Sequence, residues 1–150
     1  ISAKAGHSVK ASFRSGLLIG IGIMAGVDEI IFHQLLGWHH FYDRSTPNIG
    51  LLTDGLLHAA ELIIIVAGFF MLADVKRQQA FITIKAWAGF FIGAGSFQLF
   101  DGIVDHKVLR LHQIRYNVEL LPYDLAWNIF GLALLIIGFV LLRRSNNLNG

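Results

Sequence analysis

The sequence predicts an all-α membrane protein, a four-helix transmembrane bundle. Hydrophobic residues make up 55% of its 150 residues and charged residues only 15%, whereas a soluble domain carries about 25% charged residues. A helix needs about 20 mostly apolar residues to cross a bilayer. Four stretches meet this length, at residues 15–36, 49–73, 80–109 and 121–142. They are continuous apolar runs without alternation, which favours helices over the strands of a membrane barrel.

The composition excludes several other classes of protein. The chain has no cysteine, so a disulfide scaffold, a thiolate zinc finger and a cysteine nucleophile are impossible. Its formal charge of +2 is too small to indicate a nucleic-acid partner. No nucleophile elbow, phosphate loop or cofactor fingerprint occurs, so the sequence leaves open whether the protein is an enzyme.

Lysine and arginine at the ends of the spans predict the orientation, because these residues concentrate on the cytoplasmic side. Eight lie on one side, at Lys4, Lys10, Arg14, Lys76, Arg77, Lys85, Arg143 and Arg144. Four lie on the other, at Arg44, Lys107, Arg110 and Arg115. We therefore expect one transmembrane domain at 15–142 between cytoplasmic tails at 1–14 and 143–150.

The chain also contains an internal repeat, with one copy at about 15–73 and the other at about 80–142. A shift of 73 residues aligns two copies of the pattern Asp-x4-His-x5-His, which are Asp28, His33, His39 and Asp101, His106, His112. A shift of 70 residues aligns the second span with the fourth, including Asp54 with Asp124. Each copy would be a helical hairpin, and two tandem hairpins keep the same orientation about a pseudo-two-fold axis along the membrane normal.

Acidic residues and histidines recur inside or at the edges of the spans. They are Asp28, Glu29, His33, Asp54, His58, Glu61, Asp101, Asp105, His106 and Asp124. A charge at the bilayer centre costs at least ~2.5–3.5 kcal/mol, so such residues face the bundle interior and pair with something. The basic residues lie at the helix ends. Either the acids are protonated, or a cation shares their space.

A metal site in the outer half of the membrane is the sharpest interpretation. Imidazole suits iron, copper and zinc, and metal-bound histidines donate their other nitrogen to a nearby acceptor. The candidate ligands are His33, His58, His106 and His112. Further ligands or supporting acceptors are Asp28, His39, His40, Asp54, Glu61, Asp101 and Asp124. Asp28 and His33 are five positions apart, which is about 140° around an ideal α-helix, so this pair shares a helix face only loosely.

Other interpretations fit the same residues. Two histidines on facing helices could ligate haem b, although several carboxylates fit a haem pocket poorly. Buried acids and histidines also form proton relays, or hydrogen bonds between helices. Glu29 and Asp105 are predicted to be solvated or capping residues. Glycines at Gly16, Gly20, Gly89 and Gly93 allow close packing, either inside the bundle or against a subunit of a larger complex or homo-oligomer.

The segment from Gly26 to His40, G-V-D-E-I-I-F-H-Q-L-L-G-W-H-H, resembles the opening motif of a family of small bacterial predicted membrane proteins of unknown function. That motif reads roughly D-G-I-V-x-H-Q-x-L-x-W-H-H. Residues 100–106 and 111–113 resemble a second copy, in which Gly102 keeps the glycine that Glu29 replaces. The resemblance covers nearly all of 15–142. It implies a four-span protein of the bacterial inner (plasma) membrane and no established activity.

Overall fold

The computed structural model describes residues 3–147, and this part of the chain is helical with no strands, as the sequence predicts. Its elements are α1 (Ala3–Val27), η1 (Asp28–Leu35), α2 (Pro47–Arg77), α3 (Thr83–Leu99), η2 (Phe100–Val108) and α4 (Leu120–Asn147). The two η segments are π-helices that continue α1 and α3 without a break. Thr46 caps the start of α2 by accepting a hydrogen bond from the Ile49 amide, and Pro47 occupies the first turn, where its missing N–H costs nothing.

Three helical stretches of the described chain are long and apolar enough to cross a membrane: Ser8–Leu35, Pro47–Arg77 and Leu120–Asn147. The fourth predicted span, 80–109, contains α3 and η2. α3 alone has 17 residues, slightly short of the ~20 that a crossing requires. The membrane character of the chain therefore agrees with the sequence, while the crossing by α3 and η2 stays a prediction.

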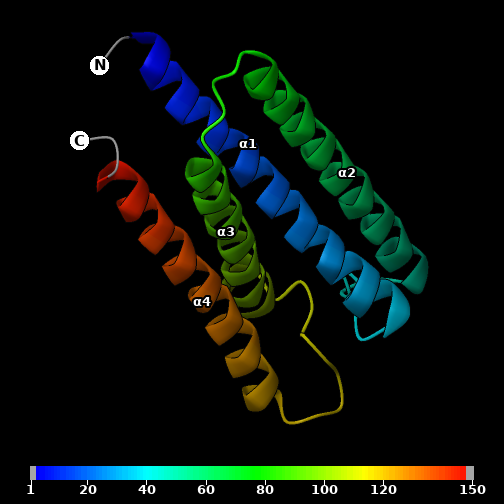
Figure 1. Cartoon of the computed structure of the whole chain (residues 1–150). Helices are drawn as coiled ribbons and strands as arrows, with labels where there is room; N and C mark the ends of the chain where they lie inside the picture. The colour runs from blue at the N-terminus through cyan, green and yellow to red at the C-terminus, as the bar shows by residue number, and fades with distance from the viewer. Residues whose placement is uncertain (1–2, 148–150) are drawn as a thin grey trace.

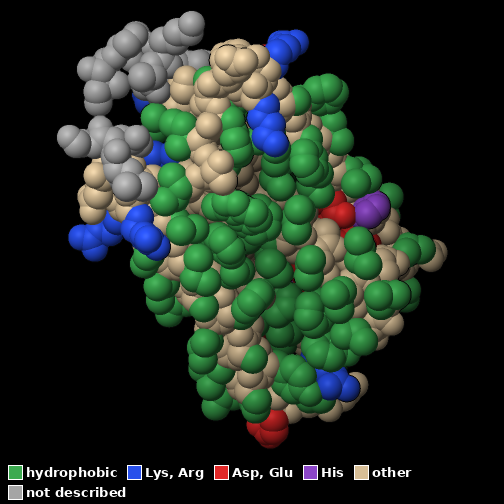
Figure 2. Space-filling view, in the orientation of Figure 1, with side chains coloured by type: hydrophobic (Ala, Val, Ile, Leu, Met, Phe, Trp, Pro, Cys, Tyr) green, Lys and Arg blue, Asp and Glu red, His purple; other side chains and the backbone are tan. Residues whose placement is uncertain are grey.

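The four α-helices lie side by side in the order α2, α1, α3, α4 (Figure 1). α1 packs on α2 and α3, and α3 packs on α4, whereas α2 and α4 do not touch within the described residues. The start of α1 and the end of α4 lie at the same end of the molecule. Figure 2 shows hydrophobic side chains over most of one face, with many of the Lys and Arg side chains gathered toward that end.

The central α1–α3 contact is built on glycine, and its contacts are reciprocal. A Cβ atom placed on Gly16 would lie 1.9 Å from the Ala86 carbonyl oxygen, and one on Gly89 would lie 2.1 Å from the Phe13 oxygen. Gly16 and Phe13 align with Gly89 and Ala86 at the same 73-residue shift. Gly20 and Gly93 repeat the arrangement one turn further along, against Phe90 and Leu17. The small-residue spacings thus serve close helix packing inside the molecule.

Both π-helices end in the same way, with a residue of left-handed backbone conformation. Gly37 has φ +57° and Arg110, the residue 73 positions later, has φ +52°. This conformation terminates helices. Beyond it, the chain leaves each π-helix and enters a loop. The loops meet where the Asp43 amide donates to the Leu111 carbonyl oxygen at 3.0 Å. This meeting point carries the histidines described next.

Candidate metal centre

Both Asp-x4-His patterns lie in π-helices, which changes the expected geometry of each pair. A π-helix hydrogen-bonds residue i to residue i+5, so residues five apart lie on adjacent turns rather than about 140° apart. His33 Nε2 lies 3.5 Å from Asp28 Oδ2, and His106 Nε2 lies 3.2 Å from Asp101 Oδ2. The prediction that these pairs share a face only loosely was therefore wrong, because it assumed α-helical geometry.

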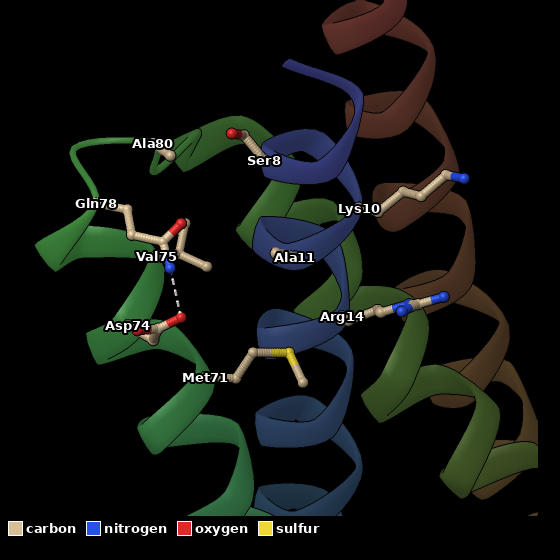
Figure 3. A pocket seen from close by; sticks show the side chains of 9 residues that line it. All are labelled: Ser8, Lys10, Ala11, Arg14, Met71, Asp74, Val75, Gln78 and Ala80. Carbon is tan, nitrogen blue, oxygen red and sulfur yellow. Dashed lines mark hydrogen bonds between the residues drawn. The ribbon is translucent and has the colours of Figure 1, made fainter. Parts of the chain in front are cut away.

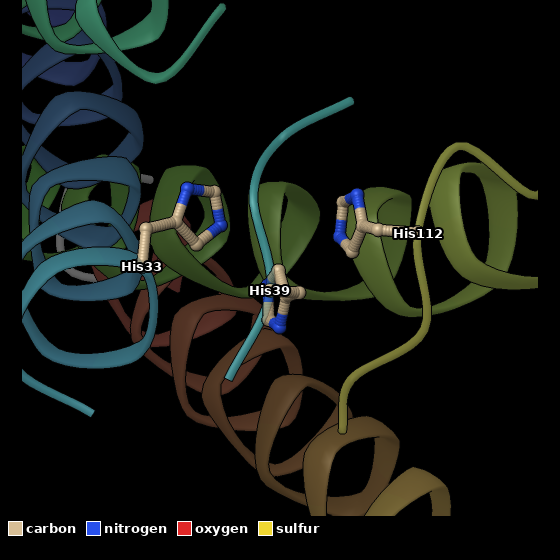
Figure 4. A group of neighbouring side chains, drawn as sticks. All are labelled: His33, His39 and His112. Carbon is tan, nitrogen blue, oxygen red and sulfur yellow. The ribbon is translucent and has the colours of Figure 1, made fainter. Parts of the chain in front are cut away.

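Four histidine rings form one buried cluster, comprising His33, His39, His106 and His112. The ring centroids of His39 and His112 are 4.4 Å apart with only 5° between their planes. His33 lies 4.5 Å from His39, and His106 lies 4.7 Å from His112. None of the four residues is more than 4% exposed. Figure 4 shows three of them converging, His33 from its helix and His39 and His112 from the chain beyond the two π-helices.

His39 and His112 are oriented by reciprocal hydrogen bonds between the two halves of the chain. His39 Nδ1 lies 2.8 Å from the Ile114 carbonyl oxygen, and His112 Nδ1 lies 2.8 Å from the Phe41 carbonyl oxygen. A carbonyl oxygen can only accept, so Nδ1 carries the proton in each ring. In the neutral imidazole, Nε2 then holds a lone pair. Both Nε2 atoms are buried and have no hydrogen-bond partner.

The lone pair of His112 faces a carboxylate oxygen. His112 Nε2 lies 3.4 Å from Asp101 Oδ1. His33 presents Nε2 toward Asp28 in the same way, because its Nδ1 is engaged elsewhere. Both ring nitrogens of His106 are buried without a hydrogen-bond partner. Two acceptors that face each other repel, so the arrangement calls for a proton or a metal cation between them.

Two carboxylates hold the His33 ring at its other nitrogen, Nδ1. His33 Nδ1 lies 3.1 Å from Asp54 Oδ1 and 2.7 Å from Glu29 Oε2. Asp54 also pairs with His40 Nδ1 at 2.5 Å and accepts a hydrogen bond from the Phe41 amide at 2.7 Å. Asp54 is fully buried. It thus fixes the ring of His33 and, through Phe41, the loop that carries the carbonyl acceptor of His112.

Within the described part of the chain, three sets of side chains offer ligand atoms that lie within 4.8 Å of one another. They are His33, His39, His112; Asp101, His106, His112; and Glu29, His33, Asp54. The first two share His112 and together contain the whole four-histidine cluster. The third contains the carboxylates that orient His33.

The two loop histidines differ in protonation. Burial, together with the nearby His112 and His33, lowers the pKa of His39 to about 2. His39 is therefore neutral at physiological pH, which is the form that binds metals. Burial also disfavours protonated His112, but Asp101 outweighs that effect and raises the pKa of His112, because its carboxylate would accept a hydrogen bond from a protonated Nε2 and carries a negative charge. His112 is thus where a proton competes most directly with a metal ion.

The other predicted residues lie outside the cluster. His58 Nδ1 pairs with Glu61 Oε1 at 2.5 Å, and the His58 side chain is 46% exposed. His58 thus meets one predicted supporting residue, but it belongs to none of the ligand sets that contain His33, His106 and His112. Asp124 pairs with Lys107 at 2.5 Å. Glu29 and Asp105, predicted to be solvated or capping, are buried at 2% and 6% exposure. The i, i+4 spacing of Glu29 and His33, which places two residues on one helix face, is the signal that could have identified Glu29.

The two halves of the chain differ beside the cluster. Glu29, at the position that aligns with Gly102, and Glu61, which aligns with Gly131, have no acidic counterparts in the second half. A Cβ atom on Gly102 would lie 2.6 Å from Trp127 Cδ1, and one on Gly131 would lie 2.9 Å from Gln98 Cγ. Trp127 and Gln98 thus occupy in the second half the space that carboxylates occupy in the first.

A separate pocket lies between the first half of α1 and the end of α2 (Figure 3). Asp74 accepts a hydrogen bond from Gln78 there at 2.7 Å, and the side chains of Lys10 and Arg14 point away from this pair. None of the lining residues that the structure describes is a histidine. It offers no ligand set comparable with the cluster.

Comparison with protein-family models matches residues 15–145 to a family described as "Predicted membrane protein (DUF2243)". This match confirms the family resemblance seen in the sequence. Comparisons with curated proteins and with solved structures found no match.

Proposed function

The chain belongs to the DUF2243 family of predicted membrane proteins, and we propose that it binds a transition-metal ion through His33, His39, His106 and His112. The observation that carries this proposal is the pair of reciprocal hydrogen bonds from His39 and His112 Nδ1 to backbone carbonyl oxygens. Metal-bound histidines are oriented in this way, with one nitrogen held by an acceptor and the other free for the metal. Here the free nitrogens are buried and point into one cluster.

The donor set favours iron, copper or zinc. Imidazole suits all three, and adjacent carboxylates add preference for iron or zinc. Asp28 and Asp101 lie beside the Nε2 atoms of His33 and His106, where each could complete the coordination sphere. We assign Asp54 and Glu29 the role of orienting His33. His58 stands outside the proposed ligand set because it pairs with Glu61 at a half-exposed position.

Haem b fits these histidines less well than a metal ion does. Three pairs of rings in the cluster have centroids 4.4 to 4.7 Å apart, which leaves no room for a macrocycle between them. Buried carboxylates lie directly against the rings, whereas a haem pocket is largely apolar. Direct ligation of an ion requires no such space.

We further propose that α3 and η2 form a fourth span and that the chain is two tandem hairpins. Together they give 26 helical residues, from 17 in α3 and nine in η2, which suffices to cross a bilayer. The reciprocal glycine contacts and the reciprocal histidine bonds, all related by the same 73-residue shift, support the repeat. Basic residues near both termini support cytoplasmic ends in a bacterial inner membrane, with the metal centre in the outer half.

The test is metal content per chain in protein purified without chelators, together with a visible absorption spectrum. We expect close to one equivalent of metal and no Soret band. His39→Ala and His112→Ala should each lower the metal affinity at least ~10-fold, the lower end of what even supporting residues cause. His58→Ala is the matched control and should keep its metal. A metal-free wild-type chain that also fails to take up iron, copper or zinc after reconstitution into lipid would refute the proposal.

A further inference from the structure

Two buried carboxylates share one hydrogen-bond donor beside the histidine cluster. His33 Nδ1 lies 3.1 Å from Asp54 Oδ1 and 2.7 Å from Glu29 Oε2. The hydrogen bond of this nitrogen goes to Asp54, so Glu29 Oε2 is left buried without a hydrogen-bond partner. Glu29 and Asp54 are 2% and 0% exposed. Buried charges are paired with an opposite charge or coordinate a metal, so this place calls for a cation.

The second half of the chain carries a positive charge at the matching place. Asp124, which aligns with Asp54, pairs with the Lys107 ammonium at 2.5 Å. The same ammonium donates a hydrogen bond to Gln113 Oε1 at 3.2 Å, and Gln113 aligns with His40 at the 73-residue shift. The Lys107 ammonium thus marks a cation position between the counterparts of Asp54 and His40.

The first half has no lysine at that position. Gln34 aligns with Lys107, and its side chain donates a hydrogen bond to Glu29 Oε1 at 2.8 Å. Among the described residues, the carboxylates that pair with lysine or arginine do not include Asp54 or Glu29. The first half therefore repeats the cation position with one more carboxylate and without a built-in cation.

His40 connects this place with the surface. Its Nδ1 lies 2.5 Å from Asp54 Oδ2, and its side chain is 35% exposed, whereas no histidine of the cluster is more than 4% exposed. Gly50 leaves room for the ring, because a Cβ atom there would lie 2.8 Å from His40 Cδ2. In the second half the aligned residue is Leu120. One accessible imidazole and two carboxylates form a donor set that suits iron or zinc.

We infer that His40, Asp54 and Glu29 form an entry site, which binds a divalent transition-metal ion weakly on its way to the four-histidine centre. The inference rests on the proposed function and deepens it by naming the route into that centre. His33 joins the two places, because its Nδ1 faces Asp54 and Glu29 while its Nε2 faces Asp28. Asp54 is thus a ligand of the entering ion only, and it orients His33 once the ion has moved on.

The kinetics of Co²⁺ uptake test this inference. Co²⁺ binds the same nitrogen and oxygen ligands as iron and zinc and absorbs visible light when imidazoles coordinate it, so the loading of metal-free protein in lipid nanodiscs can be followed directly. Gln34→Lys places the lysine of the second half in the entry site. We expect it to slow association at least ~10-fold, because charge at an entrance changes on-rates on that scale.

His40→Ala should slow association and dissociation by the same factor, because a ligand that the ion contacts only in transit does not change the final affinity. Gln113→Ala, at the aligned position, is the matched control and should load as fast as the wild type. At excess Co²⁺, the wild type should also bind a second, weaker equivalent that Gln34→Lys lacks.

Equal association rates in the wild type, Gln34→Lys and His40→Ala would overturn the inference. A His40→Ala protein that loads at the wild-type rate but loses Co²⁺ faster would overturn it as well, because His40 would then only support the centre. The two proposals fail separately. Weak, Gln34-sensitive binding without a tight equivalent would support the site and contradict the four-histidine centre, whereas tight, His39-dependent binding with an unchanged rate in Gln34→Lys would do the reverse.

Discussion

The imidazole rings of His39 and His112 stack at 4.4 Å, and the Nδ1 of each donates a hydrogen bond to a backbone carbonyl oxygen beside the other. The acceptors belong to Ile114 and Phe41, each two residues beyond the partner histidine. Each loop therefore holds the histidine of the other loop in place. Two rings fixed in this way, with buried Nε2 lone pairs, are the strongest structural argument for a bound cation.

The carboxylate of Asp54 should control metal affinity without being a ligand itself. Asp54→Asn removes the charge that orients His33 and His40, and we expect metal affinity to fall ~10–100-fold, as for other residues that support ligands. Competition with a chromophoric chelator measures this affinity. Asp124→Asn is the matched control, because Asp124 aligns with Asp54 but pairs with Lys107. Equal losses in both variants would contradict the orienting role.

The glycine contact between α1 and α3 should dominate the stability of the fold. In Gly89→Ala the new Cβ atom would lie 2.1 Å from the Phe13 carbonyl oxygen, so the helices must separate, at a cost of at least the ~1–3 kcal/mol typical of overpacking. Gly55→Ala is the control. Its Cβ would meet open space, and the change should stabilise α2 by ~0.5–1 kcal/mol. Thermal unfolding in detergent compares the two, and a Gly89→Ala protein as stable as wild type would disprove the contact.

Removal of the metal should leave the helices in place. Among the described side chains, the glycine contacts between α1 and α3 involve no histidine, so chelator-treated protein should keep its helical circular dichroism signal. The melting temperature should fall, because a ligand that binds only the folded state stabilises it by mass action. If chelation abolished the helical signal, the metal would have to be structural for the whole bundle rather than local to the loops.

Reporter fusions test the predicted orientation of the chain in the membrane. A fusion after Arg144 should show cytoplasmic activity, and a reporter inserted near Thr46 should show periplasmic activity, because lysine and arginine favour the cytoplasmic side. Periplasmic activity from the Arg144 fusion would show that the topology is opposite to the predicted one. The metal centre would then lie in the cytoplasmic half of the membrane.

The sequence predicted the helical membrane class because apolar length alone decides it. It also selected His33, His106 and His112, which the structure brings together, because a repeated Asp-x4-His-x5-His pattern is independent of exact geometry. It placed His39 only among the further ligands or supporting residues, although the same pattern aligns His39 with His112. His39 lies in a loop, and only the contact between the two loops, which no local pattern encodes, buries it in the cluster.

The sequence also favoured His58, which the structure leaves beside Glu61. The reason lies in helix geometry. The i, i+4, i+7 spacing of Asp54, His58 and Glu61 places them on one face of an ideal α-helix. Yet Asp54 is fully buried and His58 half-exposed, since α1 is the one α-helix that α2 contacts within the described residues. The π-helices also defeated the prediction for Asp28 and His33. At 3.6 residues per turn these two residues lie apart, whereas the π-helix brings them together.

X-ray absorption spectroscopy of the metal-loaded protein tests the central claim most directly, because it counts the imidazole ligands around the ion. We predict three or four histidine nitrogens at about 2.0–2.1 Å if the metal is zinc, one fewer in His39→Ala, and an unchanged spectrum in His58→Ala. A spectrum without imidazole scattering, or one that changes in His58→Ala but not in His39→Ala, would contradict the four-histidine centre.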